Sequence, residues 1–433
     1  MDRQDVSPVQ IIRGNALALP LADDSVDLVV TSPPYFGLRS YQDGGEHYSG
    51  QIGDEPTPAE FVDALIAATA EMARVVKPSG SIWVNLGDKY ASTSTPGPQS
   101  QNTTMTGGRH KGVENIAQRR LTSNVPTKSL IGIPWRYALR CIDDLGLILR
   151  ANVIWSKPNG LPESVTDRVR RSHEDWFHFT LNPRYYSAVD EIREAHVATT
   201  TGRDTSGWRT GPSGQNRGTS TGRGFDDGKP LGEFATSPLG KLPGSVWTIP
   251  TEPLHVPDHL GIDHFAAFPT EFPRRIIQGW SPRGICVECG EGRRPTSERD
   301  PIDPRFLASN KRGDGRGNVE VRGVSQSSIL RTGLQAGQSP ATRITGEACA
   351  CPEPTAPTRP GVVLDPFGGT GTTALVAHAL GRHGISNDMS SDYCRLAQWR
   401  TSDPKQQAKA ARREYVPPRE QTEGQLDLLE GIA

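Results

Sequence analysis

The chain of 433 residues lacks any apolar run close to the roughly 20 residues that a membrane-spanning helix needs. Residues 1–10 are polar and acidic, so we expect no secretory signal. An excess of charge is also missing, because 48 Lys and Arg stand against 49 Asp and Glu. Any contact with a polyanion must therefore come from local basic patches. We expect an intracellular protein that has no membrane partner.

Apolar residues are scarce, at 34%, whereas the chain has 46 glycines and 36 prolines. Much of the chain must therefore be loop, and its length predicts one large domain with insertions, or two domains. Cysteines number only six. Cys141 and Cys394 stand alone in helix-like stretches and are predicted core residues, whereas the other four form two close pairs. Without an export signal, paired cysteines indicate metal ligands before disulfides.

Residues 362–373 follow the pattern of a buried strand, a glycine-rich turn and the start of a helix. Gly368, Gly369 and Gly371 allow a tight turn and the close approach of a ligand. No Lys-Ser or Lys-Thr pair follows the glycines, and their spacing is not that of the dinucleotide fingerprint. The next apolar run ends at Asp388, which is placed to accept hydrogen bonds from ribose hydroxyls. This pattern favours a nucleoside cofactor that needs no phosphate site.

A second motif follows the short apolar run Leu28–Val30, which is typical of a buried parallel strand. Pro33 and Pro34 end that strand, so residues 31–35 are expected at its carboxyl end. In open α/β sheets this edge binds ligands. The simplest alternative is a Pro-Pro turn beside a buried tyrosine.

The chemistry of residues 31–35 suits a base amino group, whose nitrogen is a poor nucleophile because its lone pair is delocalised into the ring. The Ser32 side chain and the Pro33 carbonyl are acceptors that can orient the two amino hydrogens, and the neighbouring prolines hold that carbonyl stiffly. Tyr35 can stack on a base rotated out of a duplex.

The surrounding pattern predicts alternating strands and helices, hence a mostly parallel sheet with right-handed crossovers. Thr57 is a capping residue for a helix that ends near Val76, before a strand over 81–86. The tail after Thr401 is expected to be poorly ordered. Further helices are predicted at 134–145, 374–380 and 392–400, and further strands at 150–156, 173–180 and 384–388.

The two motifs together resemble the amino-methyltransferases of DNA, the N4-cytosine and N6-adenine enzymes, in the circularly permuted order of their beta group. Five further segments are similar to family blocks in the same order: Gly14-Asn15, Lys77–Gly80, Trp155–Asn159, Ser245–Thr248 and Phe268–Glu271. The resemblance implies an α/β fold, the Rossmann-like methyltransferase fold that binds S-adenosylmethionine. Its mostly parallel sheet would have helices on both faces, inserted loops and a small zinc-ribbon-like insertion.

The resemblance also assigns roles to residues. Ser32, Pro33, Pro34 and Tyr35 would be catalytic. Asp388 would bind the ribose of S-adenosylmethionine, and Asn15 stands where the family often has Asp near the adenine. The segment Phe268-Pro269 would close over the methionine end of the cofactor. Other residues expected to line the cofactor pocket are Thr31, Asp365, Phe367, Gly369, Thr370, Gly371 and Thr372.

The expected partner is double-stranded DNA with the target base flipped out, and a cognate restriction endonuclease is a further candidate. Transfer would be direct, because the chain shows no Pro-Cys nucleophile of the kind that ring-carbon methylation needs. Ser-Pro-Pro-Tyr favours N4 of cytosine, with N6 of adenine as the alternative. The expected location is the cytoplasm of a bacterial or phage-infected cell.

Three other functions stay open at this point. RNA and protein-amide methyltransferases usually have Asn where Ser32 stands. A nucleotide-binding oxidoreductase would leave residues 31–35 unexplained. An inactive DNA-binding remnant would fit the substitution at Asn15.

The four paired cysteines, Cys286, Cys289, Cys349 and Cys351, predict a closed, tetrahedral structural zinc site, with buried free thiols as the alternative.

Two locally basic, Gly-rich stretches are either solvated linkers or arms that contact a phosphate backbone. The predicted organisation is a catalytic half over 10–198, a flexible basic segment and candidate target-recognition region over 199–244, a cofactor-binding half over 245–284 and 361–400, an inserted zinc segment with a disordered basic loop over 285–360, and a tail over 401–433.

Overall fold

The computed structural model describes residues 9–37, 42–43, 46–47, 50–91, 125–160, 162–195, 239–262, 268–299, 342–351 and 355–416. The chain divides into two compact units. The first comprises Met1–Tyr186, Ser245–Ile285 and Thr358–Ala433, and the second comprises Ser187–Gly244 and Cys286–Pro357. Residues 92–124, 196–238 and 300–341 lie outside the described residues; they include most of the loop over 91–124, most of the basic segment over 199–244 and the basic loop of the predicted zinc segment.

The first unit is built on an eight-stranded sheet, and all of its strands run parallel except β7. The prediction of a mostly parallel sheet is therefore confirmed. In spatial order the strands are β1 (Val9–Arg13), β14 (His383–Asp388), β13 (Val362–Asp365), β2 (Val26–Thr31), β5 (Val76–Leu86), β7 (His173–Thr180), β6 (Ile148–Ser156) and β8 (Val246–Thr248).

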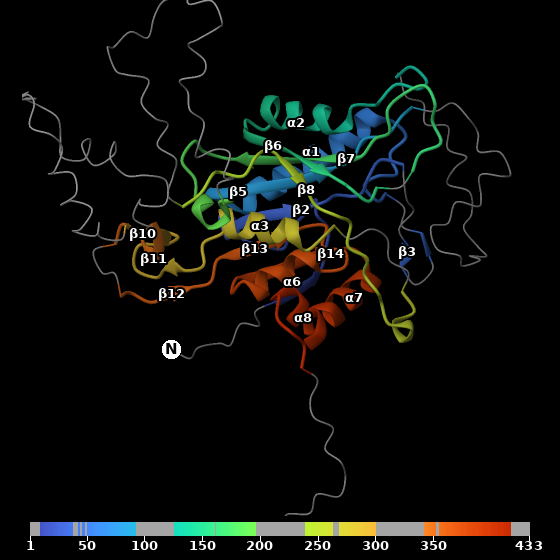
Figure 1. The fold of residues 1–433 in the computed structure, drawn as a ribbon. Helices are drawn as coiled ribbons and strands as arrows, with labels where there is room; N and C mark the ends of the chain where they lie inside the picture. The colour runs from blue at the N-terminus through green and yellow to red at the C-terminus, as the bar shows by residue number, and fades with distance from the viewer. Residues whose placement is uncertain are drawn as a thin grey trace, which may run out of the picture. The chain divides into compact units, whose positions relative to one another are not determined.

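Helices cover both faces of this sheet, as Figure 1 shows and as the resemblance implied. On one face lie α1 (Pro58–Val75) and α2 (Ile133–Asp143), and on the other lie α3 (Glu271–Trp280), α6 (Thr372–Ala379) and α7 (Ser391–Ser402). The helix α8 (Pro404–Ala410) packs against α6 and α7. Short 3-10 helices span Val189–Ile192 and Asp258–Leu260.

Smaller strand pairs lie outside the main sheet. They are β3 (Gln42–Asp43) with β4 (Glu46–His47), β9 (Ile285–Cys286) with β12 (Thr358–Arg359), and β10 (Arg294–Arg299) with β11 (Thr342–Ala348). Of the described helices, none combines the length and the apolar character that crossing a bilayer requires.

Strand β7 is buried on both faces, because its side chains alternate between the two helical layers. Phe177 and Phe179 contact Tyr137 of α2. Trp176 points the other way and stacks on Phe272 of α3, with ring centroids 5.1 Å apart. Aromatic packing on both faces thus supports the single antiparallel strand in an otherwise parallel sheet.

Two details differ from the sequence prediction. Helix α1 ends at Val75, and β5 starts at Val76 rather than at Ser81, with irregular pairing to β2. At this irregularity, a Cβ on Gly80 would lie only 2.8 Å from the Asp27 carbonyl oxygen, so the close approach of the backbones requires glycine. The expectation of a poorly ordered tail from residue 401 is wrong for its first part, because α8 buries Ala410 against the domain; residues 417–433 lie outside the described residues.

Candidate active site

The two sequence motifs meet at the carboxyl ends of neighbouring strands. Strand β2 ends at Thr31 and leads into residues 31–35, hereafter the Ser-Pro-Pro-Tyr loop. Strand β13, its neighbour, ends at Asp365 and leads into residues 366–371, hereafter the glycine loop. A hydrogen bond of 2.6 Å from the Thr31 hydroxyl to the Asp365 carboxylate joins the two, across 334 positions of sequence. This edge is where an open α/β sheet binds its ligands.

Asp365 is enclosed at this junction, with 1% of its surface exposed. Its carboxylate accepts hydrogen bonds from the hydroxyls of Thr31 and Thr373, and from the backbone N–H of Phe367 at 3.2 Å. Burial raises the pKa of Asp365 to about 6, although these hydrogen bonds act in the opposite direction. The geometry makes Asp365 an organiser of both loops, and a direct contact with a cofactor stays a prediction.

The glycine loop lies so close to β14 that side chains do not fit. A Cβ on Gly368 would overlap the Ser386 hydroxyl oxygen. Gly371 has a φ of +72°, and a Cβ there would lie 2.9 Å from the Cβ of Ala397 in α7. The tight turn inferred from the glycines is therefore present, and packing against Ser386 and Ala397 requires glycine at both positions.

Asp388 ends β14 at the rim of the same edge. Its two carboxylate oxygens accept hydrogen bonds from the backbone N–H groups of Gly369, at 2.8 Å, and Ser390, at 2.9 Å. Its carbonyl accepts from the N–H of Gly14, which brings the exposed Asn15 to this edge. The Asn15 side chain accepts from the N–H of Leu17 and so forms a local turn.

Thr370 of the glycine loop and Thr372, the first residue of α6, share a partner that sequence reasoning missed. The Arg400 guanidinium donates hydrogen bonds of 2.7 Å to both hydroxyls from α7. Arg400 is 4% exposed, and burial lowers its pKa to about 10, so it is charged at neutral pH. The loop therefore rests on a buried positive charge.

Phe268 and Pro269 precede α3. The Phe268 ring meets Trp176 edge-on, with centroids 5.7 Å apart, and Pro269 is buried. The next residue, Thr270, donates from its N–H and its hydroxyl to the Glu252 carboxylate. Because α3 packs against α6, the helix that follows the glycine loop, this segment lies on the same face of the sheet as α6.

The Ser-Pro-Pro-Tyr loop is anchored through Tyr35, whose hydroxyl lies 2.7 Å from the Glu174 carboxylate and 2.8 Å from the Asn85 amide oxygen. A phenol has only one proton to donate, and the Glu174 carboxylate is a stronger acceptor than the Asn85 amide oxygen. The Tyr35 hydroxyl therefore donates to Glu174. Glu174 is itself ion-paired with Lys157. The Ser32 hydroxyl also reaches the Asn85 oxygen, at 3.3 Å.

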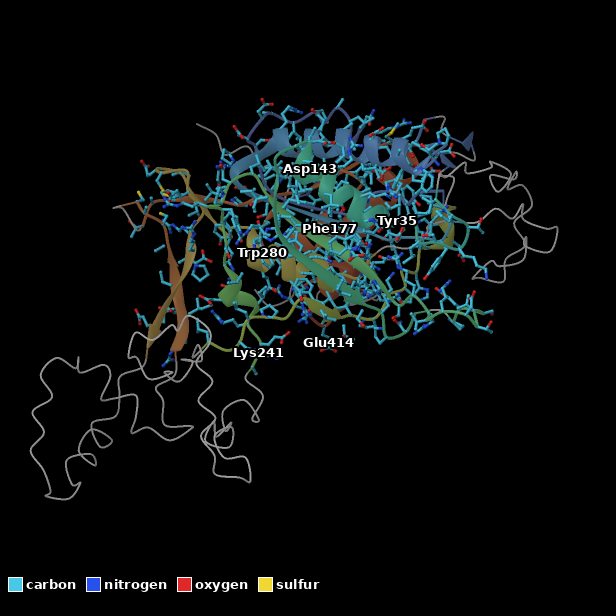
Figure 2. The ribbon with its side chains drawn as sticks, turned by 90° about the horizontal axis from the view of Figure 1, so that it is seen from above. Tyr35, Asp143, Phe177, Lys241, Trp280 and Glu414 are labelled. Carbon is cyan, nitrogen blue, oxygen red and sulfur yellow. The ribbon has the colours of Figure 1, made fainter. Side chains whose placement is uncertain are left out.

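The Tyr35 ring rests on backbone, because a Cβ on Gly87 would lie 2.7 Å from its Cε2 atom. Figure 2 shows Tyr35 to one side of Phe177 and Trp280 to the other, so Tyr35 stands toward one end of the sheet. Pro33 is buried, whereas Ser32 and Tyr35 are half-buried. The loop thus combines a fixed backbone with side chains that remain partly accessible.

Asn85, Glu174 and Lys157 were missed as site residues. Asn85 lies within a buried strand, and Glu174 follows a polar stretch, so neither shows a local motif. They meet only because β5 pairs with the antiparallel β7. Lys157 falls within a family-like segment, and that was the one available signal.

The cysteines separate into two groups. Cys141 and Cys394 are buried in helices, as predicted, and burial raises the pKa of Cys141 to about 12. In the second unit the sulfur atoms of Cys286, Cys289 and Cys349 all lie within 4.8 Å of one another. Among the described residues this group does not include Cys351, so the structure brings together three of the four predicted ligands.

Comparisons with known proteins identify the family of the chain. The family model described as DNA methylase, for N6 and N4 enzymes, matches residues 26–287 and 355–399. The Type II methyltransferase M.Cfr9I of Citrobacter freundii is 32% identical over 278 residues, which are 63% of this chain and 73% of that protein. M.SmaI of Serratia marcescens is 36% identical over 187 residues, 43% of this chain and 60% of that protein. The solved PvuII DNA methyltransferase (cytosine-N4-specific) aligns over 94% of this chain and 91% of its own, with 16% identity and a TM-score of 0.48.

Proposed function

Because the chain belongs to the DNA methylase family of N4-cytosine and N6-adenine amino-methyltransferases, we propose that it methylates N4 of cytosine in double-stranded DNA. The methyl donor of this family is S-adenosylmethionine. The observation that supports these roles most directly is the 2.6 Å hydrogen bond between Thr31 and Asp365. It joins the loop suited to an amino group to the loop suited to a nucleoside cofactor.

The Ser-Pro-Pro-Tyr loop would prepare the attacking nitrogen. The Ser32 hydroxyl oxygen and the Pro33 carbonyl would accept the two amino hydrogens and so orient the lone pair toward the methyl group. S-adenosylmethionine, when bound, would supply the methyl group: its carbon–sulfur bond would break, with the electron pair left on sulfur, as the nitrogen–carbon bond formed. The methylated nitrogen would then release one proton to water. Positioning and electrostatics account for catalysis of this kind.

Tyr35 would hold the target base. The base must leave the duplex to reach an enclosed site, and an aromatic ring offers a stacking surface. The hydrogen bond to Glu174 and the contact with Gly87 fix the ring before a base arrives. This preorganisation supports a role in base stacking rather than in proton transfer.

The cofactor would lie across the glycine loop. We assign the ribose to Asp388, the adenine side to Asn15 and the methionine end to Phe268-Pro269. The half-buried position of Asp388 at the end of β14 supports the first assignment. Phe367, Gly369, Thr370, Gly371 and Thr372 would line the remaining pocket, while Asp365 holds the loop in place.

The choice of cytosine rests on Ser32. Its short side chain ends in one hydroxyl, whereas the N6-adenine enzymes that the chain resembles typically have a longer carboxylate there. Transfer to N6 of adenine is the competing outcome of the same experiments. Target recognition is assigned to residues 199–244.

The names of the relatives support a further partner. M.Cfr9I and M.SmaI are Type II methyltransferases from bacteria. We therefore infer that this chain protects the DNA of a bacterial cell against a restriction endonuclease with the same target, in the cytoplasm.

The proposal is tested with the purified chain, S-adenosylmethionine labelled in the methyl group, and three acceptors: double-stranded DNA, heat-denatured DNA and RNA. We expect label in double-stranded DNA only. Pro33→Ala and Tyr35→Ala should abolish transfer while cofactor binding persists, whereas Gly369→Val should abolish cofactor binding. Label in RNA, or full activity of Tyr35→Ala, would contradict the assignment.

A further inference from the structure

Three thiols from two distant segments converge in the second unit. Cys286 ends β9, Cys289 lies on the turn that follows, and Cys349 follows β11 directly. Their sulfur atoms all lie within 4.8 Å of one another. Thiolates around a tetrahedral zinc ion, each about 2.3 Å from the metal, stand about 3.8 Å apart. The observed cluster is therefore within about 1 Å of that arrangement.

The turn between the first two thiols has the shape of a metal-binding knuckle. The N–H of Cys286 donates to the Glu291 carbonyl, and the N–H of Gly290 donates back to the Cys286 carbonyl, each at 2.9 Å. Gly290 adopts a φ of +72°, which favours glycine. This turn brings the sulfur atoms of Cys286 and Cys289 within 4.8 Å of each other.

The segment around this cluster has almost no core of its own. This segment is Cys286–Pro357, and among its residues whose burial is described only Cys286 and Ala356 are buried. The hairpin of β10 and β11 buries none of its described side chains. A segment this polar cannot be stabilised by apolar burial, and small folds of that kind depend on metals or disulfides. A disulfide joins only two sulfurs, so three mutually close thiols favour a metal.

We propose that the second unit binds one structural zinc ion through the thiolates of Cys286, Cys289, Cys349 and Cys351. Thiolate ligands select zinc over the magnesium and calcium that oxygen ligands prefer. Cys351 is separated from Cys349 by one residue and would supply the fourth sulfur. With four protein ligands the site is closed, so the zinc activates no water and takes no part in methyl transfer.

The zinc ion stabilises the hairpin. It joins the turn before β10 to the end of β11, and so closes the end of the hairpin at which Arg294 pairs with Ala348. The binding free energy of the metal becomes folding free energy of this segment, because the ligands are dispersed in the unfolded chain.

Metal analysis of the full-length chain, purified without chelators, tests the proposal. We expect one zinc per chain in the wild type and in the control Cys141→Ala, whose thiol is buried in α2. Cys286→Ser and Cys349→Ser should each lose most of the zinc. A wild-type chain without zinc, whose four thiols react freely or whose mass shows disulfides, overturns the proposal.

X-ray absorption at the zinc edge tests the ligand set. The wild type should show four sulfurs at about 2.3 Å, and Cys351→Ser should show three sulfurs and one lighter atom. Three sulfurs in the wild type would remove Cys351 from the site. If the serine variants do not fold, titration of the wild type with an organomercurial is decisive: zinc must leave in proportion to the thiols modified, and release before any thiol reacts contradicts the assignment.

Discussion

Replacing Tyr35 by Phe removes one hydroxyl and leaves the aromatic ring, so it tests how the Ser-Pro-Pro-Tyr loop is held. The hydroxyl donates to Glu174 at 2.7 Å, and Glu174 is paired with Lys157. We expect the ring of Tyr35→Phe to lose its fixed orientation. A flipped base would then bind in several poses, of which few bring its amino group to the methyl donor.

The expected loss of activity follows from the strength of the hydrogen bond between Tyr35 and Glu174. A hydrogen bond to a charged group contributes about 1.5–3 kcal/mol. If that free energy serves to fix the ring, kcat/KM for DNA falls by about 10-fold to about 150-fold. The hydrogen bonds described for this hydroxyl go to Asn85 and Glu174, and neither residue belongs to the glycine loop. The Kd for S-adenosylmethionine should therefore stay unchanged.

A double-mutant cycle with Glu174→Gln isolates this bond. The glutamine keeps the size of the side chain and removes its charge, so most of the loss in Tyr35→Phe should already be present in Glu174→Gln. The assay is single-turnover transfer of labelled methyl to DNA, with cofactor binding measured by calorimetry. If the fold-loss in transfer rate of the double variant equals the product of the two single losses, the hydrogen bond does not couple the two residues. That result, or a wild-type rate for Tyr35→Phe, would contradict the positioning role.

Three further predictions follow from packing and burial. Gly87→Ala should lower methyl transfer without weakening cofactor binding, since its Cβ would lie 2.7 Å from the Tyr35 ring; equal rates in a transfer assay would contradict this. Gly368→Ala should weaken S-adenosylmethionine binding measured by calorimetry, because its Cβ would overlap the Ser386 hydroxyl. Adding Ser386→Ala removes that hydroxyl and should restore part of the binding. An unchanged Kd in the single variant would refute the clash. Burial lowers the pKa of His178 to about 3, so the unfolded chain takes up a proton below about pH 6.5 while the folded chain does not. Stability is therefore lost as the pH falls, by about 2 kcal/mol between pH 6.5 and pH 5, and denaturant unfolding should show a smaller loss in His178→Asn.

The raised pKa of Asp365 acts in the opposite direction over part of this range, because the folded protein then binds the proton more readily. Both proteins in the His178 comparison contain Asp365, so its contribution cancels. A His178→Asn variant with the same pH dependence as the wild type would show that His178 is not held neutral.

The motifs could be predicted from sequence because their chemistry is local. The glycines of residues 368–371 and the prolines of residues 33–34 restrict the backbone wherever they stand, and apolar runs before them indicate buried strands. The rule that open α/β sheets bind ligands at the carboxyl ends of their strands predicted the position of residues 31–35, whereas the meeting of the two loops depends on β2 lying beside β13. The resemblance then supplied the cofactor.

Other features depend on strand register and tertiary packing, which no local pattern contains. Asn85 and Glu174 reach Tyr35 only through the pairing of β5 with β7. Arg400 looks like a solvated charge on α7, yet it is buried against the glycine loop. The polar sequence of α8 likewise hid a helix whose last residue, Ala410, is buried.

The central claim is that this chain methylates N4 of cytosine in DNA through the Ser-Pro-Pro-Tyr loop. The most direct test is mass spectrometry of nucleosides from the DNA of a methylation-free host that expresses the wild-type chain, with Tyr35→Ala as the matched control. We expect N4-methylcytosine with the wild type and none with the variant. N6-methyladenine would contradict the choice of base, and the absence of any methylated base from a folded chain that binds S-adenosylmethionine would contradict the activity itself.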